Sequence, residues 1–152
     1  MKHLLEKLLN LTEDDIFKPF SVEEVIQQRL KDCTLNSDGT YSCEGNVDLS
    51  DLGLTMLPVK FKEVKGFFDC NYNQLTSLEG APREVGVNFF CHYNNLTTLE
   101  GAPEHVAGAF WCDRNQLTSL KGAPEKVGGY FWCSDNPVPE DELKQTVSRS
   151  YL

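Results

Sequence analysis

Apolar positions recur along the middle of the chain every 21 residues. The stretches FDCNYNQL, FFCHYNNL, FWCDRNQL and FWCSDNPV begin at Phe68, Phe89, Phe110 and Phe131, and a degenerate copy begins at Val47. In register they give the unit F-x-C-x-x-N-x-L-T-[ST]-L-x-G-A-P-x-x-V. In the F-x-C step both side chains lie on one face of a short strand. A period of this length with this leucine spacing predicts a solenoid whose coils pack on one another.

The fixed polar and turn residues of the unit also have predicted roles. The asparagine follows the strand where the chain bends away, so its amide is expected to hydrogen-bond backbone groups that the bend leaves unpaired. The glycine of each G-A-P triplet permits positive φ, and the Ala-Pro pair after it favours an extended backbone. The asparagines are Asn73, Asn94, Asn115 and Asn136, and the glycines are Gly80, Gly101 and Gly122.

The ends of the chain predict helices that close the solenoid. Ser21 and Glu24 form a capping-box pattern ahead of VEEVIQQRLKD, and HLLEKLLNL near residue 3 is a second amphipathic segment. TLNSDGTYS between Cys33 and Cys43 predicts a hairpin, and PEDELKQTVSRSYL from Pro139 predicts a last helix. We therefore expect an α/β repeat fold with one parallel sheet of about five strands. Residues 1–45 would be the N-terminal helical and hairpin cap, 46–138 the solenoid and 139–152 the capping helix of one cooperative domain.

Residues 46–138 resemble the leucine-rich repeats of bacteria and their phages. PREV, PEHV and PEKV match the segment before the strand of the short bacterial repeats, and NQLTSL, NNLTTL and NQLTSL match the segment after it. The chain has Phe and Cys where the family usually has Leu or Val. The resemblance implies a leucine-rich-repeat solenoid of phage or bacterial type. It also raises the hypothesis of a phage-encoded inhibitor of a host defence protein, acting in the bacterial cytoplasm.

The residues beside each buried Phe and Cys are predicted to face outward. Phe90, Trp111 and Trp132 then occupy equivalent positions on neighbouring strands about 4.8 Å apart, and we call these three residues the aromatic row. A register shift of one residue would bury Asp69 and His92 without partners, which disfavours it. The predicted partner-binding residues are Phe67, Asp69, Tyr72, Phe90, His92, Tyr93, Trp111, Asp113, Arg114, Tyr130 and Trp132.

Three interpretations of the aromatic row remain open at this stage. It can dock another protein, because Trp, Tyr and Arg are common hot-spot residues. It can instead be covered by the N-terminal helices. Alternatively, a second copy of the chain can cover it, and the protein would then be a homo-oligomer. A platform for stacking sugars or nucleobases is disfavoured, because no basic stripe accompanies the aromatic residues.

Catalysis and cofactor binding find little support in the residues. His92 and Asp113 could form an acid–base pair, with Cys33 or Cys43 as a remote nucleophile, but nothing supplies an oxyanion site. Cysteines 70, 91, 112 and 133 are spaced evenly, unlike the close pairs of zinc sites. We therefore expect no catalytic residue, no metal and no cofactor.

Net charge and hydropathy limit the kinds of partner and the cellular compartment that we expect for this protein. Lys and Arg total 14 against 23 Asp and Glu, a net charge of −9, which argues against nucleic acid as a partner. No segment reaches the length of about 20 apolar residues that a membrane span needs, and Glu6 and Lys7 interrupt the N-terminal apolar stretch. We therefore expect a cytoplasmic protein, in which Cys33 and Cys43 remain thiols.

Overall fold

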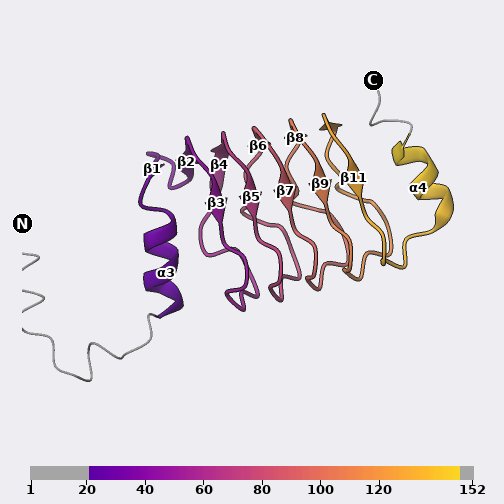
Figure 1. The fold of residues 1–152 in the computed structure, drawn as a ribbon, viewed down its shortest axis with the longest axis horizontal. Helices are drawn as coiled ribbons and strands as arrows, with labels where there is room; N and C mark the ends of the chain where they lie inside the picture. The colour runs from indigo at the N-terminus through magenta and orange to yellow at the C-terminus, as the bar shows by residue number, and fades with distance from the viewer. Residues whose placement is uncertain (1–20, 148–152) are drawn as a thin grey trace, which may run out of the picture.

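The computed structural model describes residues 21–147, which fold as a β-solenoid of parallel strands with a helix at each end (Figure 1). The predicted helix at HLLEKLLNL lies outside the described residues. The chain begins with α3 (Val22–Arg29) and the strands β1 (Cys33–Leu35) and β2 (Tyr41–Cys43). The coils supply β3 (Val47–Asp48), β4 (Phe61–Val64), β5 (Phe68–Asp69), β6 (Glu84–Val85), β7 (Phe89–Phe90), β8 (His105–Val106), β9 (Phe110–Trp111), β10 (Lys126–Val127) and β11 (Phe131–Trp132), and α4 spans Glu140–Val147.

The coils form two sheets, so the prediction of a single parallel sheet is corrected. The predicted sheet of F-x-C strands is present as β11-β9-β7-β5-β3, all parallel. A second sheet, β1-β2-β4-β6-β8-β10, is made by the P-x-x-V segments and by the hairpin. Each proline favours an extended backbone, and the backbone that follows it pairs with the preceding coil, as when Ala107 N–H donates to Val85 O at 2.9 Å. In β6 and β8 the valine is the one buried residue, so the sequence shows no apolar alternation like that of F-x-C by which to recognise a strand.

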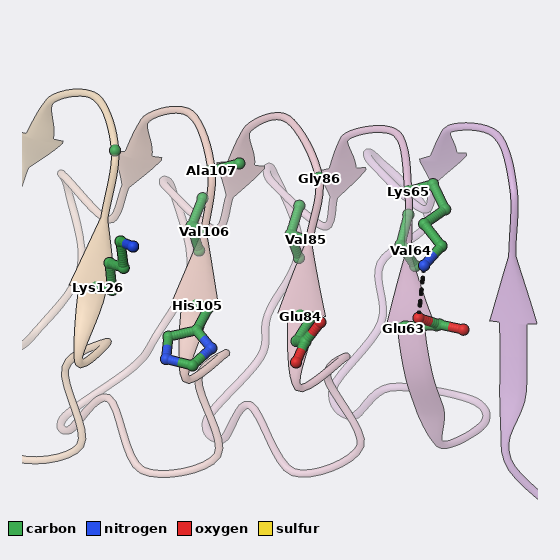
Figure 2. A pocket seen from close by; sticks show the side chains of 11 residues that line it. Glu63, Val64, Lys65, Glu84, Val85, Gly86, His105, Val106, Ala107 and Lys126 are labelled. Carbon is green, nitrogen blue, oxygen red and sulfur yellow. Dashed lines mark hydrogen bonds and ion pairs between the residues drawn. The ribbon is translucent and has the colours of Figure 1, made fainter.

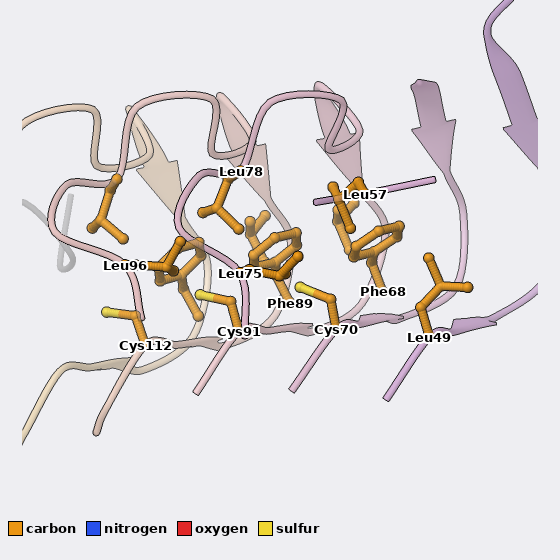
Figure 3. Packing of buried hydrophobic residues seen from close by; sticks show 14 of the residues in the cluster. Leu49, Leu57, Phe68, Cys70, Leu75, Leu78, Phe89, Cys91, Leu96 and Cys112 are labelled. Carbon is orange, nitrogen blue, oxygen red and sulfur yellow. The ribbon is translucent and has the colours of Figure 1, made fainter. Parts of the chain in front are cut away.

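The core consists of columns of identical side chains, as the sequence predicts. Phe68, Phe89 and Phe110 are fully buried, and their rings stack at centroid distances of 5.4 and 5.1 Å (Figure 3). Cys70, Cys91 and Cys112 form the next column, also at 0% exposure. Burying one such Phe contributes roughly 1.5–3 kcal/mol before conformational entropy is subtracted. Because each coil covers the faces of its neighbours, the core is continuous along the solenoid.

The asparagine column joins consecutive coils, which confirms its predicted role. Asn94 donates through Nδ2 to Cys70 O at 3.0 Å in the preceding coil and to Cys91 O at 3.1 Å in its own coil. Its Oδ1 accepts the Leu75 N–H at 2.9 Å. One buried side chain therefore satisfies backbone groups of two coils at the bend after the strand.

The glycines of the G-A-P turns have the predicted positive φ. Gly101 has φ of +87°, and a Cβ at this position would lie 2.7 Å from the Leu78 carbonyl carbon of the preceding coil. The turn closes with Ala102 N–H donating to Leu99 O at 2.9 Å. Glycine is therefore required here both for its conformation and for the close approach of two coils.

The N-terminal segment is attached to the first coil by polar and apolar contacts. Ser21 and Glu24 make the predicted capping box. Arg29 donates to Asp48 O at 2.7 Å, a carbonyl of the edge strand β3, and Leu30 is buried in the core. Polar coverage of this kind keeps an edge strand from pairing with another chain.

Two further features concern the hairpin and the C-terminal helix. Cys33 and Cys43 are register partners in the predicted hairpin and form a disulfide, so the expectation that they remain thiols is corrected. Their register places the two cysteines directly opposite each other, within reach of a disulfide. At the other end Glu142 of α4 accepts the Leu120 N–H at 2.8 Å, and Leu143 packs against the core.

Candidate functional site: the outer face of the five-stranded sheet

The orientation of the strands settles which side chains face outward. Phe and Cys of the F-x-C steps point into the core, whereas Trp111 is half-buried and Trp132 is 48% exposed. Neither indole is enclosed by its own coil, so the predicted phase is confirmed. Tyr130 lies at the same end of the sheet and is 71% exposed.

The aromatic row is continuous along the solenoid axis. Trp111 and Trp132 stack at 5.6 Å between centroids with 29° between their planes, and Phe90 lies 6.4 Å from Trp111. Phe67 extends the row by an edge contact to Phe90 at 6.3 Å. These contacts come from the in-register pairing of β7, β9 and β11, because the residues paired across the strands include Phe90, Trp111 and Trp132. The stacking explains why Phe90 and Trp111 are only partly exposed.

A second row runs parallel to the first, and we call it the tyrosine–arginine row: Tyr72, Tyr93, Arg114 and Asp135. The Tyr72 and Tyr93 rings stack at 4.3 Å, and the Arg114 guanidinium carbon lies 4.7 Å from the Tyr93 centroid. Arg114 also donates to the Tyr93 hydroxyl and forms an ion pair with Asp135 at 3.2 Å. Stacked rings and a cation over a ring face are mutually stabilising.

The backbone of the tyrosine–arginine row is in the left-handed region. Its φ values are 50°, 53°, 52° and 55° at Tyr72, Tyr93, Arg114 and Asp135. A side chain in this conformation costs about 1 kcal/mol or more relative to glycine. The chain nevertheless has Tyr, Tyr and Arg there, although glycine or asparagine would fold more favourably.

A shallow hollow of about 460 Å³ flanks the tyrosine–arginine row on its outer side. Tyr72, Tyr93 and Arg114 line one wall, and the polar side chains of Gln74 and Asn95 line another part. The row therefore borders an open hollow.

Between the two rows lies a third set of side chains, which we call the polar row: Asn71, His92 and Asp113. The Asn71 amide is 3.1 Å from His92 Nε2, which accepts this bond when the ring proton is on Nδ1. The His92 ring has edge contacts with Tyr72 at 5.7 Å and with Phe90 at 6.1 Å. Histidine therefore connects the two aromatic surfaces across the polar row.

Asp113 was predicted to face outward and contact a partner, but the structure buries it. It is only 8% exposed, and its Oδ1, like His92 Nδ1, is buried with no hydrogen-bond partner among residues 21–147. Neighbouring coils cover the carboxylate, which the alternating pattern of one strand cannot reveal. No hydrogen bond or ion pair between described residues joins His92 to Asp113. The acid–base geometry considered from the sequence is therefore not formed.

The charge on this face is unbalanced toward carboxylates. Arg29 pairs with Asp48 at 3.0 Å, and Arg114 pairs with Asp135. Asp69 has no ion pair within residues 21–147, and burial raises the pKa of its carboxyl while the Asn71 N–H bond opposes that shift. Asp113 likewise has no ion pair among the described residues.

The outer face of the other sheet has a different character. A groove of about 510 Å³ runs along β4, β6, β8 and β10 (Figure 2). Glu63, Glu84, His105 and Lys126 occupy equivalent positions along it, with Lys65 bonded to Glu63 at 2.9 Å. Its charges are mixed, and no Phe, Tyr or Trp side chain lines it.

The remaining cysteines belong to the core rather than to a site. Burial raises the pKa of the Cys91 and Cys112 thiols well above their usual range. Cys133 is half-buried at the end of the column, and a hydrogen bond from Cys112 lowers its pKa. Within residues 21–147, no cluster of His, Cys, Asp and Glu side chains fits a metal ion.

The structure brings most of the predicted binding residues onto one face. Ring contacts join Phe67, Phe90, Trp111 and Trp132. Stacking joins Tyr72, Tyr93 and Arg114, and His92 contacts both groups. Asp113 lies beneath this surface, whereas Asp69 is half-buried in the same column as Phe90. Tyr130 lies at the end of the face. The sequence analysis did not include Asn71 in the site. The sequence could have indicated Asn71, because it aligns with His92 and Asp113 in the repeat.

Comparisons with protein-family models, curated proteins and solved structures find no significant match to this chain. Neither α3 nor α4 has the length and apolar character needed to cross a lipid bilayer. Conclusions about function therefore depend on the surface itself.

Proposed function

We propose that this chain is a non-enzymatic binding module that docks another protein on the outer face of its five-stranded sheet. The main observation behind this proposal is the continuous array of aromatic side chains on that face, with Trp132, Tyr130 and Tyr72 about half exposed or more. Contiguous apolar surface of this kind is uncommon on a monomer and is associated with interaction sites. Trp, Tyr and Arg are also the residues that contribute most to binding at protein interfaces.

The left-handed residues support the same proposal. Tyr72, Tyr93 and Arg114 destabilise the fold by their backbone conformation, yet they form one stacked ridge beside the aromatic row. A rigid, stacked surface loses little side-chain entropy when a partner binds. Preorganisation of this kind favours recognition over a merely structural role.

The finer identity of the fold is part of the proposal. We place the chain with the short leucine-rich repeats of bacteria and phages, on the basis of its 21-residue unit and its asparagine column. In this proposal α3 with the hairpin and α4 act as caps, supported by the Arg29 contact to β3 and the Glu142 contact to Leu120. A phage-encoded inhibitor of a host protein is the biological role that the resemblance favours.

Photo-crosslinking tests the proposed surface directly. Tyr130, which is 71% exposed, is replaced by a photoreactive phenylalanine analogue, and the same analogue at Lys126 on the other sheet is the matched control. We expect a defined crosslinked protein from bacterial lysate with the Tyr130 probe and not with the Lys126 probe. The crosslink should disappear when Trp111→Ala and Trp132→Ala are added, while circular dichroism shows an unchanged fold.

Two results would contradict the proposal. Identical crosslinked proteins from both probe positions would remove this face from consideration. If the double Trp variant unfolds and Trp132→Ala alone also loses the wild-type fold, the indoles are structural. Crosslinking of the chain to itself, with a matching dimer in sedimentation, would favour the alternative of a homo-oligomer that buries its own aromatic row.

A further inference from the structure

The backbone donors of the five-stranded sheet point in one direction along the solenoid. In each F-x-C strand before the last, the amides of the Phe and of the Cys donate to carbonyls of the following coil. Phe110 N–H donates to Tyr130 O and Cys112 N–H donates to Trp132 O, both at 2.8 Å. Each of these strands therefore needs a following coil to satisfy its amides.

The last strand of this sheet, β11, has no following coil. The Phe131 and Cys133 N–H groups occupy the positions of the two donors in β9, and they have no acceptor among residues 21–147. Both amides point away from β9, because Trp132 between them is the residue whose carbonyl accepts from that strand. The bond from Leu120 N–H to α4 leaves both amides unpaired. The β11 edge is therefore open to a further strand.

The side chains at this edge are also incompletely covered. Phe89 and Phe110 each stack on a ring on both sides, at centroid distances between 5.1 and 5.4 Å. Among the described residues, Phe131 stacks on Phe110 alone, at 5.3 Å. Phe131 and Cys133 are partly exposed, although the equivalent side chains of the inner coils are fully buried, and Trp132 is 48% exposed. The edge therefore lacks an apolar layer as well as a hydrogen-bonding strand.

The opposite edge of the same sheet is held by the chain itself, which argues against a second copy as the missing layer. Arg29 donates to Asp48 O of β3 at 2.7 Å and to its carboxylate at 3.0 Å. A second copy that added its β3 to β11 would have to break these bonds. A second copy that added its β11 would bring its α4, which lies beyond β11 at the same end of the solenoid (Figure 1). A single extended segment meets neither obstacle.

We infer, resting on the proposed function, that the partner adds an extended segment to β11 as a parallel strand. The segment has the chemistry of the F-x-C strand that each inner coil receives. Two of its carbonyls, two residues apart, accept from the Phe131 and Cys133 amides. The side chain between them is aromatic and stacks on the Phe131 ring, and the next side chain packs on Trp132. Main-chain bonds supply affinity in such strand addition, and the alternate side chains supply specificity.

A peptide copied from the chain itself is the probe for this inference. In the protein, Asn88 O accepts from Phe68 N–H and Phe90 O accepts from Cys70 N–H, both at 2.9 Å. Residues 88–94 therefore form the strand that β5 requires, and β11 requires the same bonds.

Two altered peptides serve as controls. The probe is the acetylated and amidated peptide of residues 88–94 with Cys91→Ala, which removes thiol exchange. One control adds Phe90→Pro, which cannot donate to the receiving strand. The other adds Phe89→Asp, which removes the ring that stacks on Phe131.

The readout is hydrogen exchange of single amides, measured by NMR on the isotope-labelled full-length chain. Saturating probe should slow exchange of the Phe131 and Cys133 amides about tenfold or more, and the controls should protect them far less. The Lys126 amide, which donates to Glu104 O in the other sheet, should not change. Equal protection by all three peptides, or none by the probe, would overturn the inference. Slow exchange of both edge amides without peptide would show that the edge is already occupied, which also overturns it.

Two variants at one position test the edge from the side of the protein. Cys133→Pro removes an edge donor that is unpaired among the described residues, so it breaks no hydrogen bond there. Cys133→Ala keeps the donor. The first change should abolish protection of the Phe131 amide by the probe, and the second should retain it. The peptide controls keep the test decisive if the proline variant unfolds.

The crosslink from the Tyr130 position distinguishes failure of this inference from failure of the proposed function. Folded Cys133→Pro should lose the crosslink as fully as the double Trp variant does. An undiminished crosslink that still requires Trp111 and Trp132 would overturn the inference while the proposed function stands. A crosslink that does not require the indoles would overturn the proposed function. A dimer in sedimentation that Cys133→Pro abolishes would make the occupant a second copy and overturn the assignment to a partner.

Discussion

Replacing Asn94 tests whether the asparagine column holds the coils together. In Asn94→Ala the buried Leu75 N–H loses its acceptor, which costs about 1–3 kcal/mol. The Cys70 and Cys91 carbonyls lose one donor each but keep another, because Asn73 and Asn115 also bond to them at 3.1 and 3.0 Å. Each of these losses is therefore smaller, about 0.5–1 kcal/mol. The sum predicts a loss of about 3 kcal/mol in the free energy of unfolding.

The neighbouring residue provides a matched control. Asn95 is exposed, and its side chain accepts a single long hydrogen bond of 3.4 Å from Gln116. Asn95→Ala should therefore change the free energy of unfolding by less than about 0.5 kcal/mol. The measurement is urea unfolding of both variants, followed by circular dichroism and by tryptophan emission. Equal stability of the Asn94 and Asn95 variants would refute the reasoning.

Asn94→Asp adds a pH test with a defined sign. The second oxygen of the aspartate would face the Cys70 and Cys91 carbonyls, where Nδ2 now donates. The ionised form is disfavoured there, so the pKa of this carboxyl is raised in the folded state. Its contribution to stability is then fully present below the unfolded-state pKa and is lost as the pH rises through the folded-state pKa. The variant should therefore lose less stability, relative to wild type, at pH 4 than at pH 7, and an unchanged difference would contradict the geometry.

The remaining predictions concern the disulfide, a buried carboxylate and the free thiols. Reducing and alkylating Cys33 and Cys43, whose separation is 10 residues, should lower the free energy of unfolding by roughly 3 kcal/mol on the chain-entropy account. Because burial raises the pKa of Asp69, its ionised form destabilises the fold, so Asp69→Asn should be more stable than wild type at pH 7 and lose that advantage below about pH 4. Cys133 should react rapidly with a disulfide reagent at neutral pH, because it is half-buried and a hydrogen bond from Cys112 lowers its pKa, whereas the buried thiols react only on unfolding.

Each of these predictions has a clear opposing result. A urea midpoint unaffected by reduction would show that the hairpin contributes nothing to the cooperative unit. If the stability gain of Asp69→Asn does not depend on pH, its cause is packing rather than charge. Persistence of the fast thiol phase in Cys133→Ser would place the reactive group elsewhere in the chain.

Local features of the repeat could be predicted from the sequence because each depends on a single residue and its neighbours. The phase of Phe89 and Cys91 follows from strand alternation, and the opposite phase would have buried charged groups. The positive φ of Gly101 follows from the turn, and the bonding of Asn94 follows from the bend after the strand. Most of the proposed binding face is a consequence of that phase, since Trp111 and Trp132 occupy the alternate positions.

The structure, by contrast, decided everything that depends on contacts between coils. The second sheet forms because P-x-x-V segments of successive coils meet in register. A single buried valine in each segment does not show in the sequence as a strand. Tyr93 and Arg114 were placed on the surface, but their left-handed backbone and stacking require the coordinates of adjacent bends. Asp113 is buried because neighbouring coils cover it, which no single strand can show.

The sequence by itself therefore determined the period of the solenoid and the inward or outward direction of each strand residue, because both follow from local alternation and turn chemistry. Only the tertiary structure decided which outward side chains stack and which carboxylates are shielded from water. These properties depend on the distance between residues 21 positions apart in the chain, and the stacking of coils sets that distance.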